Sequence, residues 1–116
     1  MLPNRVRLST NATNKMQYFK SKTGITPNIL SRIAIVLALK NDGDLKNAGV
    51  ADSDGQVLDK SVLFGEHTEV YDVLINQYIH DNKIDLDIQK TITSLIEIGA
   101  HKMGHVKNLL DVCMLK

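Results

Sequence analysis

The stretch TPNILSRIAIVLAL, residues 26–39, decides the fold of this chain. Thr26 is a favourable N-cap and Pro27 suits the first helical position, so the stretch predicts a helix. Every residue from 33 to 39 is apolar, and a helix without a polar face must be buried on all sides. In a chain of 116 residues, few helices can be enclosed in this way. The helix is therefore either the centre of the domain or part of an oligomer interface.

The residues before this stretch predict a short extended segment and another helix. The run RVRLS, residues 5–9, alternates charged and apolar side chains, which places Arg5 and Arg7 on one face of an extended segment. Ser9 or Thr10 can cap the helix that follows. That helix has an apolar stripe and ends at a glycine, with the pattern Ala12, Met16, Phe19 and Gly24.

The residues after the stretch predict a loop and three more helices. Residues 42–66 are rich in Gly and Asp, which indicates a loop with a small hairpin after the Asp54-Gly55 turn. Helices are expected over about 67–81, over about 86–102 and from His105 onward. The first should turn six side chains to the core: Val70, Tyr71, Leu74, Ile75, Tyr78 and Ile79. Gly99 predicts a close contact between two helices.

The expected fold class is thus all-α, with about five helices, a short N-terminal extended segment and a small hairpin. We expect a single domain over residues 1–116. Its parts are a basic segment 1–41, an acidic loop or hairpin 42–66, and C-terminal helices 67–116.

Charge is distributed unevenly along the chain. Residues 1–41 carry seven Lys and Arg and no Asp or Glu, whereas residues 42–87 have a net charge of −8. Residues 88–116 add +2, so that the whole chain has a net charge of +1. Such asymmetry favours a polyanion partner for the basic segment. The alternative is a charge split that balances across a subunit interface.

Metal sites and reactive side chains are weakly indicated. Asp52-Ser53-Asp54-Gly55 is similar to part of an EF-hand loop, but Val50 and Ser61 stand where that loop needs carboxylates. His101 and His105 are four residues apart without the Glu of a zinc-protease motif. Cys113 lies on an apolar helical stripe, which is typical of a core residue. We therefore expect a turn at residues 52–55 and no metal.

No phosphate loop, nucleophile elbow or carboxylate pair is recognisable in the sequence, so we expect no cofactor and no enzymatic activity of the chain's own. A single cysteine fits a reducing compartment. The N-terminus lacks the apolar region of a signal peptide, and the longest apolar run, residues 33–39, is too short to span a membrane. We expect a cytoplasmic protein with no membrane partner.

The basic N-terminal segment is the candidate functional site. Its order of ribbon, helix, turn and helix is similar to the ribbon-helix-helix layout, whose strands enter the major groove of DNA. Paired arginines can grip guanine or phosphate, and a helix start offers amides to a phosphate. The alternative is an ordinary strand-helix-helix start with solvated lysines. The candidate DNA contacts are Arg5, Arg7, Lys15, Lys20, Lys22, Thr26, Asn28 and Arg32.

Several motifs resemble those of the DndE family of DNA sulfur modification proteins. The most specific are LPNRVRLS at residues 2–9, TGITPN at residues 23–28 and RIA at residues 32–34. Weaker similarity follows at LFGE, residues 63–66, at Ile98-Gly99 and at VKNL, residues 106–109. The resemblance covers nearly the whole chain.

This resemblance implies a compact helical protein that forms a homotetramer and takes part in DNA phosphorothioation, in which sulfur replaces a non-bridging phosphate oxygen. It implies that other proteins supply the chemistry: a cysteine desulfurase, an iron–sulfur protein of the sulfotransferase kind and an ATPase. DndE itself is implied to be the small DNA-binding member, with a preference for nicked duplex through surface lysines.

The leading hypothesis is an all-α homo-oligomer that binds the DNA backbone and docks the sulfur-transfer proteins. The basic segment motivates the first part of this hypothesis, and the acidic segment 42–87 motivates the second. The first alternative is a ribbon-helix-helix transcriptional regulator that binds one operator as a dimer. The second is a scaffold that binds no DNA.

Overall fold

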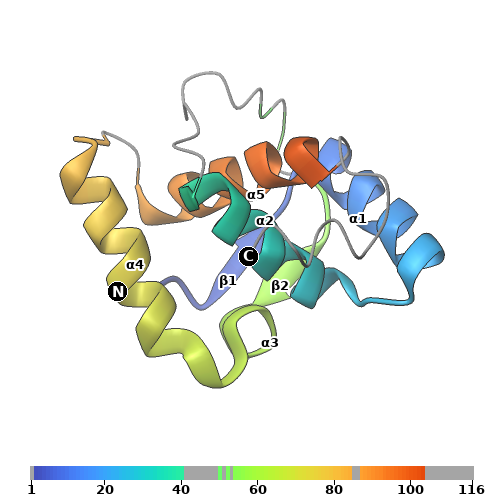
Figure 1. Cartoon of the computed structure of the whole chain (residues 1–116), viewed down its shortest axis with the longest axis horizontal. Helices are drawn as coiled ribbons and strands as arrows, with labels where there is room; N and C mark the ends of the chain where they lie inside the picture. The colour runs from blue at the N-terminus through green and yellow to red at the C-terminus, as the bar shows by residue number, and fades with distance from the viewer. Residues whose placement is uncertain (1, 41–49, 51, 53, 85–86, 104–116) are drawn as a thin grey trace.

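Two helices cross at the centre of the molecule, α2 (Pro27–Lys40) and α5 (Ile88–Met103) (Figure 1). The computed structural model describes residues 2–40, 50, 52, 54–84 and 87–103. Helix α2 begins at Pro27, as its sequence predicts. Its apolar run is largely buried within one chain, with five residues in the core: Ile33, Ala34, Ile35, Leu37 and Ala38. The interpretation of this helix as the centre of the domain is therefore confirmed.

Helices α2 and α5 approach each other at backbone distance. A Cβ atom added to Gly99 would lie 1.9 Å from the carbonyl oxygen of Ala34, which is far inside van der Waals contact. Only glycine fits at this position without a shift of one helix. The close contact predicted at Gly99 is thus confirmed, and its partner is the middle of α2.

A two-stranded antiparallel sheet lies against α5, formed by β1 (Arg5–Arg7) and β2 (Val57–Asp59). Val6 is paired with Leu58, and both side chains are buried on the inner face of the sheet. The outer face carries the neighbouring residues Arg5, Arg7, Val57 and Asp59. The extended segment with both arginines on one face is therefore confirmed.

The hairpin expected within residues 42–66 is wrong for the described part of that segment. Strand β2 pairs with β1, and residues 60–64 form the short helix α3 (Lys60–Phe64) instead of a second strand. Further backbone bonds extend the pairing with β1, from Leu8 N to Gln56 O at 2.9 Å and from Lys60 N to Asn4 O at 2.7 Å. A local hairpin would have left the backbone groups of β1 without these partners.

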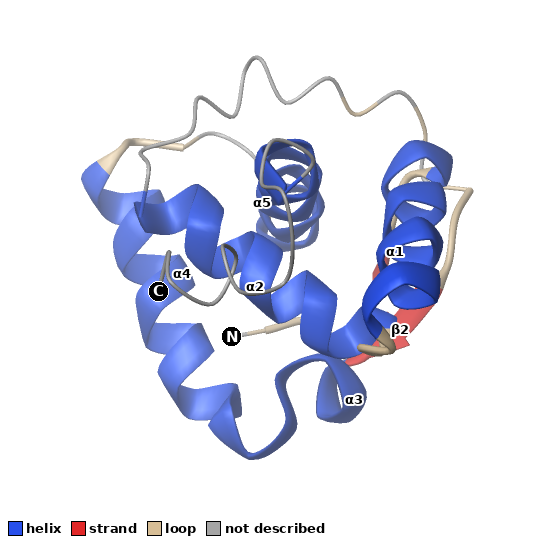
Figure 2. Ribbon diagram, turned by 45° about the vertical axis from the view of Figure 1, so that its right-hand side comes forward, coloured by secondary structure: helices blue, strands red, loops and turns tan. Residues whose placement is uncertain are grey.

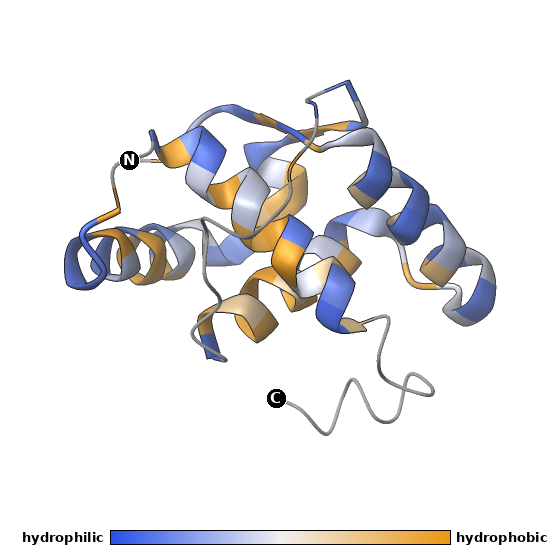
Figure 3. Ribbon diagram, turned by 90° about the horizontal axis from the view of Figure 1, so that it is seen from above, coloured by the Kyte–Doolittle hydropathy of each residue, from blue (hydrophilic) through white to orange (hydrophobic). Residues whose placement is uncertain are grey.

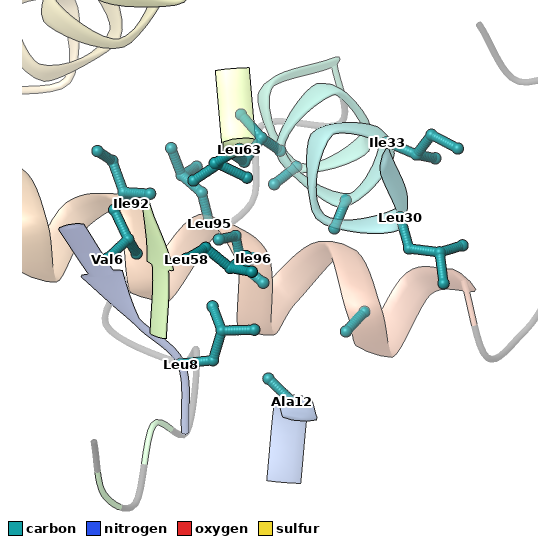
Figure 4. Close-up of a cluster of buried hydrophobic side chains, with 14 of the residues drawn as sticks. Val6, Leu8, Ala12, Leu30, Ile33, Leu58, Leu63, Ile92, Leu95 and Ile96 are labelled. Atoms are coloured by element: carbon teal, nitrogen blue, oxygen red, sulfur yellow. The ribbon is translucent and has the colours of Figure 1, made fainter. Parts of the chain in front are cut away.

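The core lies between the sheet, α5 and α2. Figure 4 shows the inner side chains of the sheet pointing toward α5, with Val6, Leu58, Ile92, Leu95 and Ile96 in one cluster. All five are at most 3% exposed. Burial of this kind contributes about 1.5–3 kcal/mol for each large aliphatic side chain. The sheet is therefore held by α5 as well as by its own hydrogen bonds.

Helix α1 (Thr10–Thr23) lies at the edge of the molecule, on the side of α2 and α5 that is opposite α4 (Figure 2). Ser9 is its N-cap and accepts a hydrogen bond from the backbone N–H of Ala12 at 3.0 Å. Gly24 ends it in the left-handed conformation, with φ of 76°. Both ends agree with the prediction. Only the narrow stripe of Ala12 and Met16 is fully buried, so most of α1 faces outward.

Helix α4 (Thr68–Asp81) follows α3 and the short 3-10 helix η2 (Gly65–His67). Its predicted core face is correct at Ile75, which is buried, but wrong at Val70 and Leu74, which are exposed. The reason is that α4 lies at an edge of the molecule, where its neighbours cover only one side (Figure 1).

The helix expected from His105 lies outside the described residues. Among the described helices, none is both long and apolar enough to cross a membrane.

The Gly99 contact gives a test in which two effects have opposite signs. Helix propensity alone would make Gly99→Ala stabilising by about 0.5–1 kcal/mol. The overlap with Ala34 should instead lower the free energy of unfolding by about 1–3 kcal/mol. Urea denaturation measures the difference, and Gln89→Ala on the exposed surface of α5 is the control, expected to change stability by less than about 0.5 kcal/mol. A more stable Gly99→Ala variant would contradict the close approach.

Candidate nucleic-acid interface

The outer face of the sheet presents Arg5 and Arg7 to solvent. Arg5 Nε lies 3.4 Å from Asp59 Oδ1, and the two side chains are 77% and 59% exposed. An ion pair this exposed contributes at most about 1 kcal/mol, because water and salt screen it. Arg5 can therefore exchange Asp59 for a phosphate at little cost. We call Arg5 and Arg7 the sheet pair.

Helix α1 carries a second group of cations, Lys15, Lys20 and Lys22, which we call the helix group. Lys20 and Lys22 are exposed and Lys15 is half-buried. Lys15 and Lys22 are seven residues apart, which is about two turns, so they share one flank of α1, whereas Lys20 lies toward the other flank. No residue of α1 is acidic. The field along its outer surface is therefore not neutralised by the helix itself.

A buried carboxylate fixes the start of α1. Glu97, on α5, is 3% exposed, and its Oε1 accepts a hydrogen bond from Ser9 Oγ at 2.6 Å. Its Oε2 accepts a weaker bond from Asn11 Nδ2 at 3.3 Å. A negative charge at a helix N-terminus is favourable, because the free N–H groups there carry partial positive charge. No motif or spacing in the sequence links position 97 to position 9, so Glu97 is not among the predicted site residues.

A second acid binds the same helix start from the loop before β2. Asp52 Oδ1 accepts hydrogen bonds from the backbone N–H of Thr10 at 2.9 Å and from its hydroxyl at 3.1 Å. The backbone N–H of Asp54 also donates to it, at 3.0 Å. The N–H groups of Asp54 and Thr10 hold the pKa of this carboxyl below its usual value of 3.8. Asp52 is thus a capping residue for the start of α1.

The start of α2 differs from the phosphate seat that the sequence suggested. Asn28 Nδ2 donates to the carbonyl oxygen of Val62 at 3.3 Å. Arg32 donates from Nη2 to the same oxygen at 3.1 Å and from Nε to the carbonyl oxygen of Leu63. Both side chains therefore tie α2 to the end of α3. Of the three candidates here, Thr26 is the one with an exposed side chain.

Seven of the eight predicted DNA contacts thus separate into three sets, and Thr26 stands apart from them, exposed before the start of α2. The sheet pair lies on β1 and the helix group on α1, and all five are exposed except Lys15, which is half-buried. The described hydrogen bonds and ion pairs do not link one of these two sets to the other. Asn28 and Arg32 form a third set with an internal structural role.

An apolar groove of about 360 Å³ lies between α2 and α4, away from α1. Burial raises the pKa of the Tyr71 phenol in this groove, and the charge of Arg32 partly offsets the effect. The exposed Leu74 lies about one turn after Tyr71 on α4, and the exposed Val70 lies about one turn before Leu74. The lining residues are Ile29, Arg32, Ile33, Val36, Leu37, His67 and Tyr71. The groove and these two neighbours form an apolar surface, which we call the α2–α4 face.

Metal-ligating side chains do not converge in the described residues, where no three of His, Cys, Asp and Glu are placed to hold an ion. His101 is exposed on the last turn of α5. His105 and Cys113, the other two residues considered from the sequence, lie outside the described residues.

Comparisons with known proteins point to one family. The family model described as DNA sulphur modification protein DndE matches residues 5–110. The crystal structure of DndE from Escherichia coli B7A, involved in DNA phosphorothioation modification, is similar with a TM-score of 0.71 and 26% sequence identity. A double glycine-to-lysine mutant of DndE is similar with a TM-score of 0.72, also at 26% identity. Each comparison covers 89% of this chain and 99% of the other. No protein of the curated collection matches the chain.

The bond between Ser9 and Glu97 makes α1 sensitive to one hydroxyl. Ser9→Ala removes the N-cap and leaves Glu97 Oε1 buried without its donor, so the free energy of unfolding should fall by about 1–3 kcal/mol. Thermal or urea denaturation measures the loss. Ser21→Ala, which removes an exposed hydroxyl of the same helix, is the matched control and should change stability by less than about 0.5 kcal/mol. If Ser9→Ala and Ser21→Ala lowered the free energy of unfolding equally, the buried hydrogen bond between Ser9 and Glu97 would not stabilise the protein more than an exposed one.

Proposed function

The chain belongs to the DndE family of DNA sulphur modification proteins, and we propose that it is the DNA-binding accessory protein of DNA phosphorothioation, without catalysis of its own. Its fold agrees with that of a DndE involved in phosphorothioation. The modification acts on backbone phosphates, so a protein that serves it needs to hold the backbone and not to read bases. Contacts to phosphate position a protein on DNA without specifying a sequence.

One observation carries the proposal: the cations of an acid-free segment lie on the surface around β1 and α1. Arg5, Arg7, Lys20 and Lys22 are exposed, and Lys15 is half-buried beside them. Long basic side chains of this kind neutralise phosphates and release counterions, which is the main source of sequence-blind affinity for DNA. The proposed contacts are therefore the sheet pair and the helix group, with Thr26 at their margin. Asn28 and Arg32 contribute by holding α2 in place.

The ribbon-helix-helix regulator is not favoured. Such a dimer inserts a ribbon formed by strands into the major groove, and our alternative required two copies to share it. Here β1 already pairs with β2 of its own chain, and α5 covers the inner face of that sheet (Figure 4). The scaffold alternative remains an outcome of the DNA-binding experiment below.

The proposal includes self-association through the α2–α4 face into a homo-oligomer, with a tetramer as the expected state. Val70, Val73 and Leu74 are exposed on α4, and Leu74 lies about one turn after Tyr71 of the apolar groove. A contiguous apolar surface on a small protein favours a protein interface, because its burial removes ordered water from that area. Helices α4 and α1 lie on opposite sides of α2 and α5 (Figure 2), so association through the α2–α4 face would leave the helix group uncovered.

Docking of the sulfur-transfer proteins is the remaining part of the proposal. Acidic side chains are exposed on α4 and on η2 before it, outside the basic segment: Glu66, Glu69 and Asp81. A surface of this sign repels DNA and attracts basic protein surfaces. We assign these three acids to contacts with the partner proteins.

The DNA-binding part is tested by a salt titration. Binding to intact, nicked and random-sequence duplexes is measured by fluorescence anisotropy at several salt concentrations. The affinity should depend steeply and similarly on salt for all sequences. Arg5→Ala with Arg7→Ala should weaken binding to every duplex and lower the salt slope by about 2, since each neutralised phosphate adds about 0.9.

The control for this titration removes two charges elsewhere. Lys83→Ala with Lys90→Ala changes exposed lysines near the connection between α4 and α5 and should change the slope by less than one unit of phosphate contact, about 0.9. Tight, salt-resistant binding to one sequence would instead support the regulator. Absence of binding at low salt would support the scaffold.

The self-association part is tested by sedimentation. Wild-type protein at micromolar concentration should sediment as an oligomer, and Leu74→Glu should shift it to smaller species, because a charge would be buried in the interface. Gln17→Glu places the same charge on the exposed surface of α1, away from the α2–α4 face, and is the matched control. A monomeric wild-type protein would overturn the proposed association.

A further inference from the structure

One aromatic ring is unlike the others in the molecule. The chain has five Tyr and Phe residues and no Trp, and all five lie within the described ranges. Four of them are buried or half-buried against the core, whereas Tyr18 is 54% exposed on α1. An aromatic side chain contributes most to stability when its ring is buried, so the position of Tyr18 contributes little to folding.

The ring of Tyr18 is held in place. It meets the ring of Phe19 edge to face, with centroids 5.6 Å apart and planes at 81°. Phe19 itself packs against the core, so the pair is anchored from below. A ring with few accessible rotamers loses little conformational entropy when it stacks on a ligand.

The surroundings of Tyr18 are cationic. Lys22 Nζ lies 5.7 Å from the centre of its ring, and Lys15, three residues before Tyr18, lies on the same flank of α1. Neutral polar side chains complete the exposed surface: Asn11, Asn14, Gln17 and Ser21. Seen in Figure 3, α1 is mostly hydrophilic, in contrast to the apolar helices at the centre.

Lysines around an exposed aromatic ring are the arrangement by which proteins bind unpaired bases. The ring provides a flat apolar surface on which a base stacks, and the lysines neutralise the phosphates on either side of that base. The contact of Lys22 with the ring is loose and exposed, so a base can replace it. Lys22 then becomes available for the neighbouring phosphate.

We propose that Tyr18, between Lys15 and Lys22, is a stacking site for an unpaired base of DNA, so that the protein prefers DNA in which a base has left the duplex stack. This inference rests on the proposed DNA binding but adds a different contact. The sheet pair and the helix group provide charge alone, and every duplex offers the same charge. Stacking requires a base that an intact duplex does not offer.

The first test compares two DNAs, a duplex with a gap of a few unpaired thymines and a covalently closed circular duplex. Tyr18→Ala should weaken binding to the gapped DNA by about 5- to 100-fold, with little change for the closed circle. Tyr18→Phe keeps the ring and should bind gapped DNA as the wild type does. Because stacking is not electrostatic, the preference for gapped DNA should persist at the salt concentrations that weaken binding to both DNAs.

The second test uses the absence of tryptophan from the chain. Tyr18→Trp introduces a single fluorophore, whose emission should be quenched when a base stacks on it. His80→Trp places the same fluorophore on the exposed surface of α4, across the molecule from α1 (Figure 1), and its emission should not respond. Gapped DNA is the ligand, and the closed circle is the negative control.

The outcomes separate this inference from the proposed function. If Tyr18→Ala binds both DNAs as the wild type does, and Tyr18→Trp is not quenched, the stacking site is wrong while DNA binding stands. If the wild type binds neither DNA at low salt, the proposed function itself fails. A loss of affinity in Tyr18→Ala that is equal for both DNAs would also overturn the stacking site, because it would indicate a general effect on α1.

Discussion

The contact between Ala34 and Gly99 is the constraint on which the rest of the structure depends. It brings the backbones of α2 and α5 together at the centre of the molecule, and the other elements pack against this pair. The sheet rests on α5 through Val6 and Leu58 (Figure 4), and α1 is tied to α5 through Glu97. A methyl group added at Gly99 would push α5 away from α2. The sheet and the start of α1 would then shift with α5, because a densely packed core cannot absorb the change locally.

The charge pattern of the chain acquires a structural meaning from these contacts. The basic segment has no acid of its own, yet the start of α1 needs acceptors for its free N–H groups. Asp52 and Glu97, from distant parts of the sequence, supply negative charge at that end. These two acids place their negative charge at the N-terminal end of α1, where it stabilises the helix. The rest of the helix keeps its lysines without acidic neighbours along the same helix.

Local sequence signals predicted most helices and strands, but they did not predict the contacts between residues that are far apart in the sequence. Pro27 and Gly24 define helix ends through their own backbone preferences, so the bounds of α1 and α2 follow from sequence. The partner strand of β2 could not be predicted. In a strand of three residues, only the middle side chain is buried, and this pattern is compatible with pairing to any neighbouring strand. The hairpin was wrong for that reason. Val70 and Leu74 were placed in the core because helical spacing identifies an apolar face without saying what covers it.

The candidate site was predictable to a similar extent. The exposure of Arg5 and Arg7 follows from period-two alternation, and the lysines of α1 from helical period. Arg32 and Asn28 were assigned to DNA because the sequence shows their charge and polarity but not the carbonyl groups of Val62 and Leu63 beside them. Glu97 could not be identified from the sequence, because its hydrogen bond with Ser9 forms only when α1 and α5 pack together.

The proposed DNA contacts of α1 and the proposed self-association through α4 occupy different sides of one small molecule, and this separation has a consequence for affinity. A single copy offers few cations, so each copy would hold DNA weakly at physiological salt. Association through the α2–α4 face would leave α1 of every copy outward, because the two lie on opposite sides (Figure 2). Once one copy of an oligomer binds a duplex, binding of the next copy to the same duplex is intramolecular. The overall affinity then rises although each copy makes the same contacts. Weak individual contacts still release readily, which suits a protein that must give the phosphate access to other enzymes.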